Sequence, residues 1–191
     1  MQKRFVEEQD LLEDAYRLAV KIFDSGFRPD FIVGIWRGGS TVGIYVQECL
    51  QYLGVETDHI AIRTSYRGRA DYFQRLEQGG EIRAHGLKYL FENLNAENRL
   101  LLVDDVYSTG RNIDAVIARL RQTLKRNMPD EWRIAAPWYR PGGGREPDFY
   151  LHETNDWLVL PYELTGLSRE ELAAHKPWIM PLLDELKPGW P

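Results

Sequence analysis

The chain is 191 residues long, with 43% hydrophobic residues, 28% charged residues and a formal net charge of −5. A chain of this length buries about 70% of its extended surface on folding, which supplies one core but not two ordinary domains. The acidic balance argues against nucleic-acid and anionic-membrane partners, and no apolar run approaches the roughly 20 residues of a membrane span. One cysteine, and an N-terminus without the apolar segment of a signal peptide, predict a cytoplasmic location.

The predicted elements alternate between helices and short buried strands. Apolar residues at three- and four-residue steps predict helices over 7–23, 42–53, 87–94 and 113–124. Short apolar runs predict strands over 30–36, 59–63, 99–104, 132–139, 149–152 and 157–162. This alternation indicates an α/β fold with a mainly parallel sheet flanked by helices, in which ligands bind beyond the carboxyl ends of the strands.

Two stretches depart from the alternation. Residues 64–86 are polar, rich in Arg and Gly and without a clear period, which predicts a functional or disordered loop. Near the C-terminus, Ser168-x-x-Glu171 predicts the capping box of a helix. The apolar residues after it are spaced for burial: Trp178, Ile179, Leu182, Leu183 and Leu186.

The most informative segment is residues 101–112, LLVDDVYSTGRN. Asp104 and Asp105 end a buried strand, and a Ser-Thr-Gly turn at 108–110 opens the next helix. Hydroxyls and N–H groups at such a turn suit a phosphate, and the two carboxylates suit vicinal hydroxyls or a hydrated Mg²⁺. A ribose 5-phosphate carries these groups in this order. The alternative is a helix cap with two solvated acids, although adjacent carboxylates repel each other and need a partner.

A second polar segment, Trp36-Arg37-Gly38-Gly39-Ser40, follows an earlier strand. The two glycines let backbone N–H groups approach an anion, and the Arg37 guanidinium can bind that anion through two hydrogen bonds. The segment lacks the lysine of a P-loop and the glycine spacing of a dinucleotide fingerprint. Taken alone, it fits an anion-binding loop and an ordinary glycine-rich turn equally well.

Residues 101–112 resemble the ribose-phosphate loop of the type I phosphoribosyltransferases, which use 5-phosphoribosyl 1-pyrophosphate (PRPP). Residues 27–163 resemble the 6-oxopurine branch of that family, the hypoxanthine, guanine and xanthine phosphoribosyltransferases. The resemblance implies the type I fold in a single domain over 1–191, with a flexible lid loop at about 64–86 and a small base-binding hood, including the C-terminal helices, at 139–191. It also implies a homodimer or homotetramer, because relatives usually form one or the other.

The implied reaction is a Mg²⁺-dependent transfer of the phosphoribosyl group from PRPP to a purine base, giving a nucleoside monophosphate and pyrophosphate. The implied catalytic residues are Asp104, Asp105, Ser108, Ser65 and Tyr66, the last two heading the lid, and the implied metal ligands are Asp105 and Glu163. The implied phosphate-binding residues are Arg37, Gly38, Gly39, Ser108, Thr109, Gly110, Arg111 and Asn112. The family often has a cis peptide before its basic loop residue, so the Trp36–Arg37 bond is a candidate for one.

The base pocket is implied by two further segments. Tyr139-Arg140-Pro141 resembles a Tyr-Lys-Pro stretch whose lysine reads the purine oxygen, with Arg140 in the place of the lysine. Trp157 and Leu158 resemble the residues that stack on the base and bind its edge. For Trp157 taken alone, core packing is the better explanation.

Ser108 departs from the family pattern. The 6-oxopurine enzymes usually have an aspartate there, thought to handle the N7 proton, and a hydroxyl is no comparable general base. Adenine-type relatives also lack an acid at this place, so catalysis is not excluded. Two alternatives follow: a catalytically weak regulator that binds PRPP or a nucleotide on the same fold, or a phosphoribosyltransferase for another nucleobase.

Overall fold

The computed structural model describes residues 3–65, 83–142 and 144–185. The chain divides into two compact units, a larger one of Gln9–Asn155 and a smaller one that joins Met1–Glu8 to Asp156–Pro191. The single domain over 1–191 stays a prediction. Within the described part of the chain, none of the helices combines the length and the apolar composition that a bilayer crossing requires.

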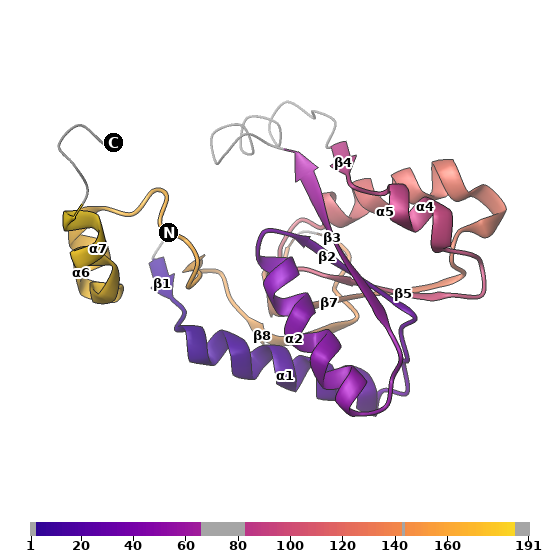
Figure 1. Ribbon diagram of the computed structural model, residues 1–191, viewed down its shortest axis with the longest axis horizontal. Helices are drawn as coiled ribbons and strands as arrows, with labels where there is room; N and C mark the ends of the chain where they lie inside the picture. The colour runs from indigo at the N-terminus through magenta and orange to yellow at the C-terminus, as the bar shows by residue number, and fades with distance from the viewer. Residues whose placement is uncertain (1–2, 66–82, 143, 186–191) are drawn as a thin grey trace. The chain divides into compact units, whose positions relative to one another are not determined.

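The larger unit alternates helices and strands as the sequence predicts (Figure 1). Its helices are α1 (Glu8–Asp24), α2 (Gly38–Tyr52), α4 (Lys88–Asn93) and α5 (Arg111–Leu124), with the short 3₁₀ helix η1 (Lys125–Asn127) after α5. Its strands are β2 (Phe31–Trp36), β3 (Asp58–Ser65), β4 (Arg83–His85), β5 (Arg99–Val103), β6 (Val106–Tyr107), β7 (Glu131–Tyr139) and β8 (Phe149–Glu153). They form one sheet in the order β4-β3-β2-β5-β7-β6, with β8 also paired to β7. All pairs except β3–β4 are parallel, which confirms the mainly parallel α/β sheet.

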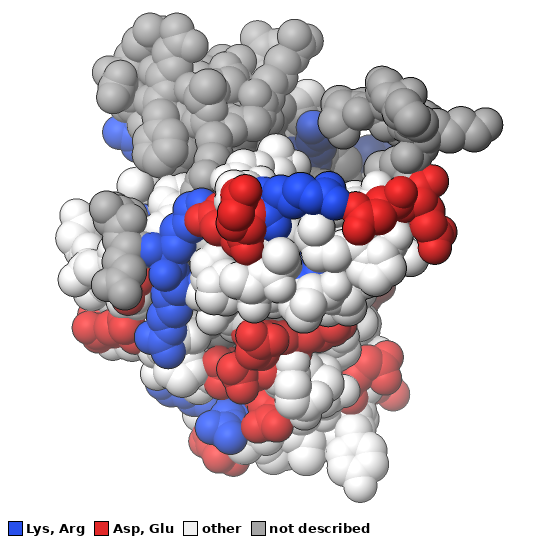
Figure 2. Space-filling view, turned by 90° about the vertical axis from the view of Figure 1, so that its left-hand side faces the viewer, with Lys and Arg blue, Asp and Glu red and all other residues white. Residues whose placement is uncertain are grey.

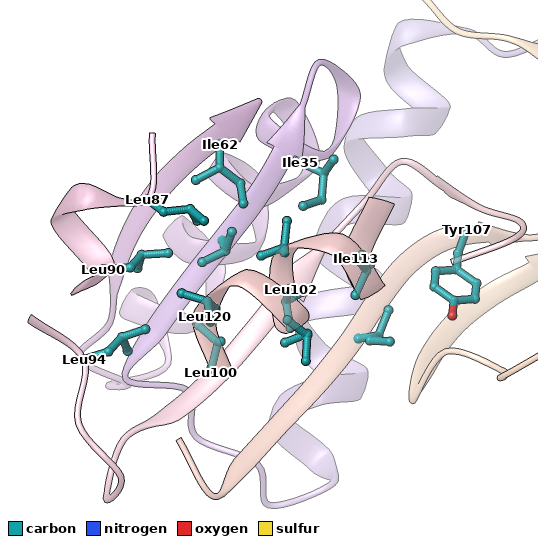
Figure 3. Packing of buried hydrophobic residues seen from close by; sticks show 14 of the residues in the cluster. Ile35, Ile62, Leu87, Leu90, Leu94, Leu100, Leu102, Tyr107, Ile113 and Leu120 are labelled. Carbon is teal, nitrogen blue, oxygen red and sulfur yellow. The ribbon is translucent and has the colours of Figure 1, made fainter. Parts of the chain in front are cut away.

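Apolar residues on both faces of the sheet explain why it is buried between helices. Helices α1 and α2 cover one face, and α4 and α5 cover the other (Figure 1). On the second face, Ile35 and Leu102 belong to a cluster that also contains Leu90 of α4 and Leu120 of α5 (Figure 3). Successive strand residues point to opposite faces, so short continuous apolar runs are what a doubly covered sheet requires.

The predicted loop over 64–86 is wrong at both ends. Strand β3 continues to Ser65, and β4 returns antiparallel to it, with Thr64 opposite Ala84 and Ser65 opposite Arg83. A three-residue strand is too short to show an alternating pattern, which explains why periodicity misses β4. Residues 66–82 of the predicted lid lie outside the described residues.

The smaller unit contains its own two-stranded parallel sheet. Strand β1 (Lys3–Phe5), which the sequence analysis does not predict, pairs with β9 (Trp157–Val159). The unit also contains α6 (Arg169–His175), the 3₁₀ helix η2 (Pro177–Ile179) and α7 (Met180–Asp184). The capping box is confirmed, because Ser168 Oγ accepts from the Glu171 N–H while the Glu171 carboxylate accepts from the Ser168 N–H.

Two predictions about the smaller unit are wrong. Strand β9 ends at Val159 rather than at residue 162, because Pro161 cannot donate a ladder hydrogen bond and the chain turns there instead. The C-terminal apolar residues are not buried in a core: η2 and α7 contain no buried residue, and Trp178 is 63% exposed. Pro177 and Pro181 divide this segment into two short pieces, so the predicted residues no longer share one face. Leu186 lies outside the described residues.

Candidate active site

The glycine-bearing segment 36–40 and the acid-bearing segment 101–112 lie at the same edge of the sheet. Strands β2 and β5 are parallel neighbours, with Val33 opposite Leu102 and Gly34 opposite Val103. Arg37 follows the carboxyl end of β2, and Asp104 follows the carboxyl end of β5. This is the edge at which parallel α/β sheets bind ligands.

Gly39 brings these two segments into direct contact. A β-carbon built on Gly39 would lie 2.3 Å from the Val103 carbonyl oxygen and 2.8 Å from the Asp104 Cα. No side chain fits in that space, since both obstacles belong to the backbone. The glycine therefore lets the first turn of α2 lie against the acidic segment, and the structure joins the predicted pyrophosphate loop to the predicted ribose loop.

Arg37 occupies the N-cap position of α2, and the Trp36–Arg37 peptide bond is cis, as the resemblance suggests. The α2 N-terminus has no side-chain cap among the described residues. Its first N–H groups have no acceptor within the helix, because those acceptors would lie before its start. A cationic side chain and a helix N-terminus thus meet at the end of β2, an arrangement that attracts an anion.

Two more glycines, Gly34 and Gly43, allow close packing around this loop. A β-carbon on Gly34 would lie 2.8 Å from the Ser40 Cα, and one on Gly43 would lie 2.8 Å from His59 Nε2. His59 Nε2 is buried without a hydrogen-bond partner among the described residues. Burial lowers the pKa of His59, although the charge of Asp58 opposes the shift. His59 therefore acts as a neutral packing group beneath the loop.

The acidic pair is held by its own backbone. The Asp105 N–H donates to Asp104 Oδ1 at 3.0 Å, and the Val106 N–H donates to Asp105 Oδ1 at 2.9 Å. The Asp104 N–H donates to the Ala135 carbonyl of β7 at 3.0 Å, which fixes the end of β5. Burial and the neighbouring charge of Asp105 raise the pKa of Asp104 well above its usual value of 3.8. The free protein thus holds two carboxyl groups that resist being charged together.

Residues Ser108, Thr109, Gly110, Arg111 and Asn112 form the turn that opens α5. Gly110 adopts φ +71° at the N-cap position, and its carbonyl accepts the Asp114 N–H at 2.9 Å. No side chain among the described residues caps this helix either. The Ser108 and Thr109 hydroxyls and the N-terminus of α5 therefore lie together after β6, which β5 and β7 separate from β2 in the sheet, and this is a combination that suits a phosphate.

Tyr107 is a part of the site that the sequence analysis missed. A β-carbon on Gly110 would lie 2.3 Å from the Tyr107 hydroxyl, so the phenol ring supports the turn from beneath. The ring lies at the margin of the buried cluster (Figure 3). Its strand, β6, has two residues, too few for any periodic pattern to reveal it.

The same strand connects the turn to the predicted base-reading residue. Strand β6 pairs with β7, and the Arg140 N–H donates to the Tyr107 carbonyl at 2.8 Å. Arg140 thus follows the carboxyl end of β7, directly beside the strand that leads into Ser108. The structure brings Arg37, the acidic pair, the predicted phosphate-binding turn and Arg140 to one edge of the larger unit.

Of the other predicted site residues, Ser65 lies at the same edge, because it ends β3, the parallel neighbour of β2; Trp157, Leu158 and Glu163 belong to the smaller unit. Trp157 and Leu158 lie on β9 of the smaller unit, opposite Lys3 and Arg4. Glu163 closes the turn after β9, where its Oε2 accepts the Leu160 N–H at 3.3 Å. Ser65 ends β3, and Tyr66 lies outside the described residues.

The acidic pair suits a hydrated cation. Among the described residues, no group of three or more His, Cys, Asp or Glu side chains could hold a metal ion. Mg²⁺ usually keeps several waters and takes only one or two carboxylates. The raised pKa of Asp104 is the observation that favours a cation here, because a positive charge would relieve the repulsion from Asp105. The residues present therefore fit Mg²⁺.

The described surface carries charges of both signs. Figure 2 shows Lys and Arg side chains close to Asp and Glu side chains on the same face. Nucleic-acid-binding proteins usually gather basic residues into a patch or stripe on one face. The face drawn is mixed in sign, in keeping with the net charge of −5.

Comparison with known proteins identifies the family. No curated protein matches the sequence. A purine phosphoribosyltransferase from Pyrococcus horikoshii Ot3 is 23% identical with a TM-score of 0.65, over 88% of this chain and 99% of the other. A hypothetical protein from Neisseria gonorrhoeae with bound ppGpp is 18% identical with a TM-score of 0.65, over 92% and 94%. The Helicobacter pylori xanthine-guanine-hypoxanthine phosphoribosyltransferase is 13% identical with a TM-score of 0.64, over 85% of this chain and 95% of the other.

These likenesses establish the fold. The phosphoribosyl transferase domain profile matches residues 1–164. The chain belongs to the phosphoribosyl transferase domain family.

Proposed function

We propose that this protein transfers the 5-phosphoribosyl group from PRPP to N9 of a 6-oxopurine. The bond from ribose C1 to the pyrophosphate oxygen breaks and a bond from C1 to N9 forms, while the base releases a proton. The products are a nucleoside 5′-monophosphate and pyrophosphate. The contact between Gly39 and Asp104 carries this proposal, because it puts the segment that we propose to bind pyrophosphate against a pair of carboxylates at one sheet edge.

Each end of PRPP has a matching group in the larger unit. Arg37 and the N–H groups of Gly38 and Gly39 would bind pyrophosphate. The turn from Ser108 to Asn112 would bind the 5′-phosphate through hydroxyls and helical N–H groups. Between them, Asp104 and Asp105 would bind the ribose hydroxyls, and their charge would stabilise the positive charge that develops on the ribose.

Asp105 would hold Mg²⁺ through its carboxylate, with Glu163 proposed as a second ligand. When bound, the metal neutralises charge on the departing pyrophosphate. Arg140 would donate hydrogen bonds to the purine oxygen, while Trp157 stacks on the base and the Leu158 backbone binds its edge. Binding both substrates in this way replaces a bimolecular encounter with a nearly unimolecular step.

The direct test is incubation with PRPP, Mg²⁺ and single nucleobases, followed by mass spectrometry of the products. We expect a new monophosphate with hypoxanthine, guanine or xanthine, and none when EDTA replaces Mg²⁺. A product only with adenine or a pyrimidine would favour the alternative of a transferase for another base. Absence of any product, with PRPP bound, would contradict the proposed activity.

A second candidate is a regulator that binds a nucleotide without catalysis. Ser108 favours it, because a hydroxyl replaces the acid that the 6-oxopurine enzymes use. The Neisseria gonorrhoeae protein of the same fold has bound ppGpp. Calorimetry with ppGpp and with PRPP, on a preparation that shows no transfer to any base, would separate this candidate from the first.

A further inference from the structure

Lys176 is a charged residue buried in the smaller unit. It is 5% exposed, at the C-cap position of α6. Lysines are almost never this deeply buried unless their ammonium group has partners. Burial lowers the pKa of Lys176, although the charges of Glu163, Glu7 and Glu8 oppose the shift. A buried ammonium is costly, so its hydrogen bonds indicate what the residue does.

The Lys176 ammonium binds the turn that follows β9. Its Nζ donates to the Leu160 carbonyl at 3.0 Å and to the Pro161 carbonyl at 2.5 Å. The Leu160 carbonyl also accepts the Glu163 N–H at 3.0 Å, and the Leu160 N–H donates to Glu163 Oε2 at 3.3 Å. One side chain therefore holds the short segment between the proposed base-stacking strand and the proposed metal ligand.

Strand β9 itself is held by the N-terminal strand β1. The Val6 N–H donates to the Val159 carbonyl at 3.0 Å, which extends the β1–β9 ladder. The Phe5 ring stacks on His175 with centroids 3.6 Å apart, next to Lys176 in the chain. Lys3 Nζ lies 2.5 Å from a Glu171 carboxylate oxygen. Strand β9 is thus paired along its length by β1 and fixed at its end by Lys176.

We infer that Lys176 is a positioning residue for purine recognition, an inference that rests on the function proposed above. Lys176 fixes the carbonyls of Leu160 and Pro161 and thereby sets the backbone that presents Trp157, Leu158 and Glu163. Removal of the ammonium leaves these carbonyls without their charged donor and frees the turn to adopt other conformations.

The test compares Lys176→Met with the wild-type enzyme in steady-state kinetics. We expect the KM for the purine to rise about tenfold, the effect of one charge-assisted hydrogen bond. The KM for PRPP should rise less, because all its proposed ligands except Glu163 belong to the larger unit. Hydrogen exchange of residues 157–163 should accelerate while that of α5 stays the same. Lys88→Met is the matched control, because Lys88 is an exposed lysine on α4, and it should alter neither KM.

Lys176→Gln keeps a shorter donor and should lie between Met and wild type; it takes the place of the Met variant if that variant does not fold. Equal changes in both KM values, or no change in either, would overturn the inference. A wild-type enzyme inactive with every base would instead contradict the proposed function. The two failures are therefore distinguishable.

Discussion

Gly39 of the first turn of α2 lies directly against the backbone of Asp104, so closely that a β-carbon would meet the Asp104 Cα at 2.8 Å. Two segments separated by more than 60 residues of chain thereby form one surface. The contact joins the proposed anion-binding loop to an acidic pair, and the short distances explain why only a glycine fits at this position.

We expect Gly39→Ala to separate the two segments. The added methyl meets the Val103 carbonyl oxygen, and overpacking of this kind costs about 1–3 kcal/mol. Thermal unfolding should show a Tm several degrees lower, and calorimetry should show weaker PRPP binding. Gly43→Ala is the comparison, because its methyl meets the His59 ring at 2.8 Å and the Gly34 Cα at 3.7 Å, and neither belongs to the acidic segment. Similar losses in the two variants would contradict the special role of Gly39.

Asp105→Asn should lower turnover much more than it weakens base binding. The substitution keeps the size of the side chain but removes a charge that stabilises the developing ribosyl cation, an effect on the order of 100-fold in kcat. Steady-state kinetics with the preferred base measure both quantities. Equal turnover in variant and wild type would refute the catalytic role of Asp105.

The stability of the metal-free protein should depend on the ionisation of Asp104. Its pKa is raised in the folded state by burial and by Asp105, so the folded protein binds more proton there than the unfolded chain does. The free energy of unfolding, relative to Asp104→Asn, should therefore fall as the pH rises from about 4 through the folded pKa, by at most about 1.4 kcal/mol per pH unit.

Urea unfolding of wild type and Asp104→Asn across this pH range provides the measurement. Saturating Mg²⁺ should reduce the slope, because a bound cation favours the ionised carboxylate. A stability difference that rises with pH would show that the carboxylate is instead stabilised in the free protein.

Ser108→Asp should increase activity on hypoxanthine or guanine. The new carboxylate would stand where the 6-oxopurine enzymes usually have one, and general acid–base catalysis contributes typically about 100-fold or more to rate. Initial rates with each base, at saturating PRPP, provide the comparison. A slower Asp variant would show that the site is adapted to another base.

The parallel sheet was predictable because its strands are buried on both faces and so have continuous apolar runs, such as Leu100 to Val103. Strands β1, β4 and β6 were not, because two or three residues carry no period. Their pairing partners are distant in the chain: β1 joins β9 more than 150 residues away. Such pairings depend on tertiary structure, which local patterns do not encode.

The residues of the candidate site also divide into those that a local motif points to and those that only tertiary contacts reveal. Arg37 and the Asp104–Asp105 pair could be proposed as candidates from the sequence because their charged groups are concentrated in short segments. The supporting residues were not: Tyr107 beneath Gly110 and Lys176 beneath the turn after β9 act through packing and backbone hydrogen bonds. The predicted burial of Trp178 failed because two prolines interrupt the periodicity on which it rested.

The central claim is that the acidic pair and the turn after it bind one sugar phosphate at the sheet edge. A crystal structure with PRPP and Mg²⁺ tests it most directly. We predict density for the ribose hydroxyls at Asp104 and Asp105, with the 5′-phosphate on the N–H groups of residues 108–112. Density for PRPP at another place on the molecule, with this edge empty, would contradict the account.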